Sequence, residues 1–140
     1  MKRFDLTRVL TTVAIVETAY AIAGLLTPPS LITLVTGWVL SPDGQWIAKL
    51  LGAALGSQAL VAWTIRKEPH PGIVIALAGY QLVASTVDWL MWVTMADAGI
   101  FSTPLARVTV AASIVIHYSL GAMLLLALRR APAPSARRFA

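Results

Sequence analysis

The chain has 140 residues, of which 58% are hydrophobic and only 12% are charged, and its formal net charge is +5. Soluble globular domains carry about 25% charged residues, so this composition argues against a water-soluble enzyme, a disordered chain and a nucleic-acid-binding module. The absence of cysteine excludes disulfides, iron–sulfur clusters and zinc sites built from thiolates.

Four long apolar stretches predict four transmembrane helices, because each is close to the ~20 residues that a helix needs to cross a bilayer. A transmembrane barrel would instead show ~10-residue segments of alternating hydrophobicity, and this sequence has none. The predicted fold is therefore an all-α, polytopic four-helix bundle. It forms one domain over residues 1–130, followed by a Pro/Ala/Arg cytoplasmic tail over 131–140. The predicted spans are 9–26, 46–65, 72–95 and 107–128.

Proline marks the connections between these spans. A Thr-Pro-Pro-Ser segment at 27–30 ends the first helix, Pro42 precedes the second, and 69–72 forms a turn before the third. Pro104 can start the fourth helix, because the N–H that proline lacks would have no partner at that position.

The stretch 30–40 is apolar but too short to cross a bilayer. It is expected to form a short helix or re-entrant piece at the outer interface, with Trp38 and Trp46 at headgroup depth. It could cap the outer mouth of the bundle. The alternative is an apolar connector without a role of its own.

The basic residues predict the orientation. Nine of the eleven lie before the first span, between the second and third, or after the fourth, and only Lys49 and Arg107 lie on the other side. Since basic residues favour the cytoplasmic side, both termini are predicted to be cytoplasmic, in the inner membrane. Residues 1–23 also resemble a signal peptide, but Glu17 interrupts the apolar run, so we expect this segment to be retained.

Three ionisable residues lie inside the predicted spans, where a charge costs about 2.5–3.5 kcal/mol on insertion scales: Glu17, Asp88 and His117. At ~1.5 Å per residue, Glu17 and His117 are both at mid-membrane and should share a layer. Gln58 and Gln81 lie slightly toward the cytoplasm, and Asp88 lies roughly 7 Å toward the outside.

Polar residues also share helix faces. The third span carries an inward stripe with Gln81, Ser85, Asp88 and Trp92, and the fourth carries Ser113, His117 and Gly121 at intervals of four. Lipid offers no hydrogen-bond partners, so these stripes should face one another. The sequence therefore predicts a polar pocket among the first, third and fourth spans.

Each central residue has several interpretations. Glu17 could be a structural group bonded to His117, Tyr118 or a side chain of the third span, a ligand- or proton-binding group, or a contact with another subunit. His117 could simply satisfy hydrogen bonds, act as an acid or base, contact a ligand, or bind haem or a metal. The only other histidine, His70, lies in a cytoplasmic turn at the wrong depth for a second axial ligand, so no metal or cofactor is predicted.

Aromatic residues beside Asp88 could form the wall of a cation or lipophile site, or an aromatic belt at the membrane surface. The predicted ligand-binding residues are Gln58, Gln81, Ser85, Trp89, Trp92 and Tyr118. In the second span, Gly52 and Gly56 form a small-residue face that permits close helix packing, within the chain or between chains.

A glutamate in the middle of the first span is also typical of the small multidrug resistance transporters, but the charged connector at 66–71 and the long first outer loop depart from that family. The first half of the chain also resembles the DoxX-like small four-helix membrane proteins. That resemblance rests on the segment 24–28 at the end of the first helix, on the apolar outer segment, and on Lys49 and Gly52 at the start of the second. It implies the four-helix fold but no particular chemistry.

Three functions are compatible with these features. The first is a small membrane protein that binds a lipophilic molecule, or an accessory subunit of a membrane complex or homo-oligomer. The second is a cofactor-independent membrane enzyme that isomerises, cyclises or opens an epoxide in a terpenoid or polyketide, with Glu17, Asp88 and His117 as its catalytic acid–base set. The third is a proton-coupled transporter. Besides these candidates, the bilayer is the one partner that the sequence requires.

Overall fold

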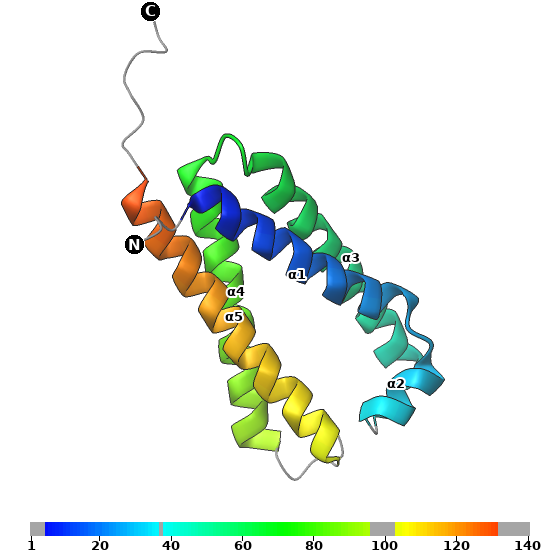
Figure 1. Cartoon of the computed structure of the whole chain (residues 1–140). Coiled ribbons are helices and arrows are strands. Elements are labelled where there is room, and N and C mark those ends of the chain that lie inside the picture. The colour runs from blue at the N-terminus through cyan, green and yellow to red at the C-terminus, as the bar shows by residue number, and fades with distance from the viewer. Residues whose placement is uncertain (1–4, 37, 96–102, 132–140) are drawn as a thin grey trace, which may run out of the picture.

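The computed structural model describes residues 5–36, 38–95 and 103–131, and every regular element among them is an α-helix (Figure 1). Four helices are long and one is short, so the predicted all-α fold with four apolar spans is confirmed. The helices are α1 (Leu6–Leu26), α2 (Pro29–Thr36), α3 (Pro42–Ile65), α4 (Pro71–Met95) and α5 (Pro104–Arg130). The predicted tail beyond residue 131 lies outside the described residues.

Helix starts depend on caps rather than on the first apolar residue. The Ser41 hydroxyl accepts a hydrogen bond from the backbone N–H of Gly44 at 3.1 Å, so α3 begins at Pro42 and not at the predicted position 46. Thr103 caps α5 in the same way, which starts that helix at Pro104 as expected. Each long helix thus begins before its predicted apolar span, because a helix can continue in polar sequence beyond the bilayer.

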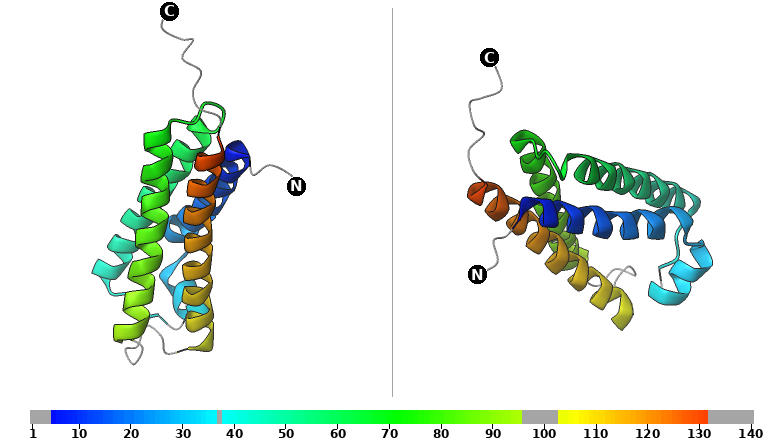
Figure 2. Two further views of the ribbon diagram at one scale, coloured as in Figure 1. Left: turned by 90° about the vertical axis from the view of Figure 1, so that its left-hand side faces the viewer. Right: turned by 45° about the horizontal axis from the view of Figure 1, so that its top comes forward.

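The four long helices form two pairs. α1 packs along α3, and α4 packs along α5, whereas α1 and α5 share a smaller contact and α3 barely meets α4. Figures 1 and 2 show the pairs close together where α1 begins and α5 ends, here called the terminal end. They spread apart toward the opposite end, here called the α2 end, where α2 contacts α5. The short helix therefore connects the two pairs at their open end.

The apolar core lies at the terminal end, where all four long helices contribute to it. The outward faces carry many exposed large apolar residues, such as Ile15, Leu60, Val83 and Val115. In water such faces would be unfavourable, but lipid solvates them. The chain is therefore a small multi-pass membrane protein whose helices contact the bilayer.

The small-residue face of α3 packs within the chain. A Cβ added to Gly52 would lie 3.0 Å from the backbone nitrogen of Leu25 and 3.1 Å from the carbonyl carbon of Gly24, both in α1. A Cβ added to Gly56 would lie 3.6 Å from that of Ala21. Glycine therefore permits the close approach of α1 and α3. The sequence left open whether this face packs within the chain or between chains, and the structure shows packing within the chain.

Candidate functional site

Three polar side chains from three helices form a hydrogen-bonded chain, here called the polar layer: Glu17 of α1, Gln81 of α4 and His117 of α5. The Gln81 amide nitrogen donates to Oε1 of Glu17, and the Gln81 amide oxygen is bonded to Nδ1 of His117. Glu17 Oε1 and His117 Nδ1 are 3.9 Å apart, too far for a direct hydrogen bond, so Gln81 bridges them. The structure thus brings together Glu17 and His117, as their matched depths predicted.

Helix packing explains how these side chains meet. Gly121 lies one turn after His117 on α5, and a Cβ there would lie 2.9 Å from the Leu82 side chain of α4. The missing side chain lets α4 and α5 approach at this level, beside Gln81. Ser85 reinforces the contact, because its hydroxyl lies within hydrogen-bonding distance of the carbonyl oxygens of Gln81 (3.1 Å) and Ile114 (3.2 Å). Ser85 is thus a helix-packing residue in this structure.

The polar layer is shut off from its surroundings. Glu17 and Gln81 are 0% exposed and His117 is 6% exposed. Burial of polar groups is costly unless they are hydrogen-bonded, and Gln81 supplies both bonds. One atom is left over: among the described residues, Glu17 Oε2 is the buried side-chain oxygen or nitrogen that has no hydrogen-bond partner.

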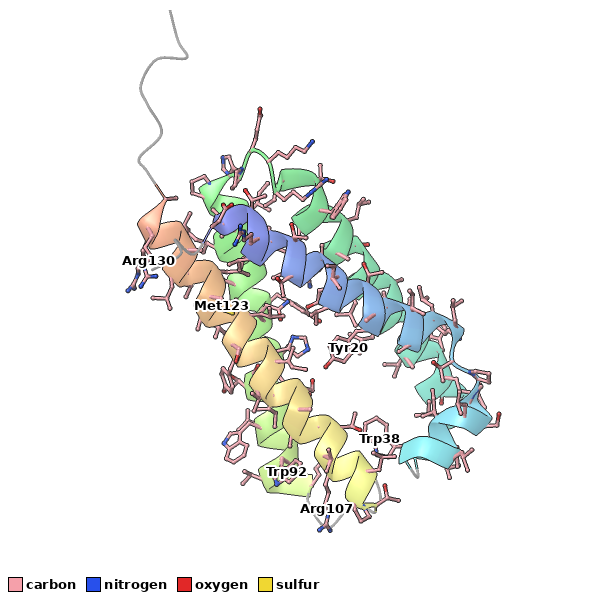
Figure 3. The ribbon with its side chains drawn as sticks, in the orientation of Figure 1. Tyr20, Trp38, Trp92, Arg107, Met123 and Arg130 are labelled. Carbon is pink, nitrogen blue, oxygen red and sulfur yellow. The ribbon has the colours of Figure 1, made fainter. Side chains whose placement is uncertain are left out.

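Tyr20 of α1 places an aromatic ring against the polar layer. Its ring stacks on the His117 ring with a centroid separation of 5.4 Å and an interplanar angle of 25°. Figure 3 shows Tyr20 extending from α1 toward α5. Sequence reasoning missed this residue, although its position three residues after Glu17 places both on one face of α1. That spacing was the signal that could have found it.

A second polar contact lies one to two turns closer to the α2 end. Asp88 of α4 accepts a hydrogen bond from the Ser113 hydroxyl of α5 at 2.9 Å. Both residues are half-buried, as is Tyr20. Asp88 thus belongs to the inward stripe of α4, as predicted from its spacing, but it is not hydrogen-bonded to the polar layer.

Burial along the inward faces changes at the polar layer. Toward the terminal end, the facing positions are buried apolar residues such as Leu10, Leu77 and Leu124. One turn toward the α2 end, Tyr20 and Ser113 are half-buried, whereas Ser85 is still fully buried. On the α2 side of the polar layer, the inward faces are therefore partly buried rather than uniformly closed.

The remaining predicted ligand-binding residues lie outside the polar layer. Tyr118 is 39% exposed, and its hydroxyl is 3.1 Å from that of Thr86 on α4. Trp89 is exposed, and Trp92 and Gln58 are half-buried, with Trp92 near the α2 end of α4 (Figure 3). The structure therefore gathers Glu17, Gln81 and His117 into one place but does not bring the predicted aromatic residues to it.

Within the described ranges, no three His, Cys, Asp or Glu side chains are grouped as a metal site requires. The chemistry available in the polar layer is that of a carboxyl group, an amide and an imidazole. Comparisons with known protein families, with curated proteins and with solved structures find no match to this chain.

Proposed function

We propose that this membrane protein binds a lipophilic small molecule, with the polar group of that molecule held at Glu17, Gln81 and His117. The observation that carries the proposal is the unpaired Oε2 of Glu17, fully enclosed beside an imidazole in an apolar bundle. An unsatisfied polar group in such a place is costly to stability, and sites that carry this cost are frequently functional. A ligand hydrogen bond would remove the cost.

The position of the polar layer supports the proposal further. A lipophilic molecule reaches a membrane site from the lipid phase, so its binding site must open between helices. The two helix pairs diverge toward the α2 end, and Tyr20 and Ser113, on that side of the polar layer, are half-buried. The apolar body of the ligand would lie between the pairs, with its polar end at the layer.

The test is to identify what remains bound to the purified protein. Wild type is transferred into lipid nanodiscs and extracted with organic solvent, and the extract is analysed by mass spectrometry beside that of Glu17→Ala. We expect a non-phospholipid compound that is enriched with wild type and lost with Glu17→Ala. Tyr118→Phe is the matched control, because it removes one hydrogen bond between α4 and α5 outside the layer and should retain the compound.

An extract of wild type that is identical to that of Glu17→Ala, with both proteins folded, would contradict ligand binding at this layer. The protein would then be better described as a structural subunit whose polar side chains serve one another.

A second candidate is acid–base chemistry on the bound molecule, favoured by a carboxyl oxygen without a partner close to an imidazole. Such a pair can donate and collect a proton, which isomerisation or cyclisation requires. Glu17→Gln separates the two functions, because an amide keeps the hydrogen bonds but cannot exchange a proton. A binder should hold the same compound in wild type and Glu17→Gln, whereas an enzyme should accumulate a different, unreacted isomer in the variant.

A further inference from the structure

The hydrogen-bond directions within the polar layer restrict the chemistry of the ligand. The amide nitrogen of Gln81 is used on Glu17, so the amide oxygen is what faces His117. An amide oxygen only accepts hydrogen bonds, and Nδ1 of His117 must therefore carry the hydrogen. In the neutral imidazole, the other nitrogen, Nε2, is then an acceptor.

Nε2 has no hydrogen-bond partner among the described residues. Unlike Oε2 of Glu17, it is also not completely enclosed, because the only enclosed and unpaired atom in the described part of the chain is that oxygen. The layer thus offers a ligand two unpaired polar atoms, an acceptor nitrogen on His117 and an enclosed carboxyl oxygen on Glu17.

A ligand group that fits must donate to Nε2. A carbonyl oxygen cannot do this, because it only accepts, and a hydrocarbon offers no polar group at all. A hydroxyl donates one hydrogen and also accepts, so it can donate to Nε2 and accept a hydrogen bond from the Glu17 carboxyl group when that group is protonated. A site built to hydrogen-bond a hydroxyl discriminates strongly against an analogue that lacks it, because the buried partner is then left unpaired.

We propose that the molecule bound at the polar layer is a lipophilic alcohol or phenol, and that its hydroxyl donates a hydrogen bond to Nε2 of His117 beside Glu17. This inference rests on the proposed function and adds the class of the ligand. It also makes His117 the residue that distinguishes an alcohol from the corresponding aldehyde.

The experiment compares three probes that share one apolar skeleton: farnesol, its aldehyde farnesal and the hydrocarbon farnesene. Each is radiolabelled and equilibrated with the protein in nanodiscs, and retention is measured above that of empty nanodiscs. We expect farnesol to bind about tenfold more tightly than farnesal, the ratio that corresponds to one hydrogen bond of about 1.4 kcal/mol. Farnesene should bind no better than farnesal.

His117→Asn is the decisive variant. The asparagine amide nitrogen can replace Nδ1 and keep the bond to Gln81, but nothing replaces Nε2. A folded His117→Asn protein should therefore lose the preference for farnesol, whereas Tyr118→Phe should keep it. Thermal stability in detergent confirms that both variants fold.

Equal retention of the three probes overturns the proposal, and so does a preference for farnesol that persists in His117→Asn. The extraction experiment tests ligand binding at the layer independently of the ligand class. If the compound enriched with wild type reacts with methoxylamine as a carbonyl and not with acetic anhydride as an alcohol, the ligand class is wrong although binding at the layer stands. If nothing is enriched, both proposals fail.

Discussion

Gln81 is the residue on which the polar layer depends. Its single amide donates to the carboxyl group of Glu17 and bonds the imidazole of His117, so it joins α1 to α5 through α4. A primary amide carries a donor and an acceptor in one planar group, so a single side chain serves both partners. Loss of this one residue would leave two buried groups without partners.

We therefore expect Gln81→Leu to reduce the free energy of unfolding by about 1–3 kcal/mol, the usual cost of leaving buried polar groups unsatisfied. Thermal unfolding in detergent measures the effect. Gln58→Leu is the matched control, because Gln58 is half-buried on α3 and is not bonded to the layer. A Gln81→Leu protein as stable as the Gln58→Leu protein would mean that the bridge contributes nothing to folding.

Close contact between α1 and α3 is the main feature at the scale of the helices. Gly24 and Gly52 face each other across this contact, and Lys49 of α3 donates a hydrogen bond to the carbonyl oxygen of Leu25 near the end of α1. The last carbonyls of a helix have no intrahelical partners, so this contact satisfies one of them. Within lipid, the hydrophobic effect does not drive helices together. Van der Waals packing and polar caps therefore stabilise the pair of α1 and α3.

Gly52→Ala should weaken this pair, because the added Cβ would lie 3.0 Å from a backbone nitrogen that cannot move independently of α1. We expect a loss of about 1–3 kcal/mol in unfolding free energy, as for other overpacked cores. Gly79→Ala is the same substitution where no atom lies within 4 Å, and it should be neutral or stabilise α4 by up to about 1 kcal/mol. Equal stability of the two variants would show that the α1–α3 contact is more adaptable than its geometry implies.

At the scale of the whole molecule, the four long helices place the start of α1 and the end of α5 at the same end of the bundle (Figure 1). The turn between α3 and α4, with Arg66 and Lys67, lies at this end too. The basic residues of the described chain are therefore concentrated at the terminal end, and the positive-inside rule predicts that this end faces the cytoplasm.

Alkaline phosphatase is active only outside the cytoplasm, so its fusion to the C-terminus should be inactive and its fusion directly after α4 should be active. Both fusions are assayed in intact bacteria and compared at equal expression. An active C-terminal fusion would reverse the orientation, and activity in both positions would contradict four spans.

The amino-acid sequence by itself determined the class of protein and the depth of its polar residues. The length of an apolar run is a local property, and a helix advances by a fixed rise per residue, so the four spans and the common level of Glu17 and His117 could be predicted. The inward face of α4 followed from helical periodicity for the same reason.

Only the tertiary structure decided which side chains are partners. Rotation of each helix about its axis and the pairing of α1 with α3 and α4 with α5 depend on contacts between distant segments, such as those at Gly52 and Gly121. These contacts select Gln81 instead of Tyr118 as the partner of Glu17 and stack Tyr20 on His117. No local sequence pattern determines these partners, because several rotations of a helix about its axis satisfy the same hydrophobic spacing. Only close packing against the neighbouring helices distinguishes among these rotations.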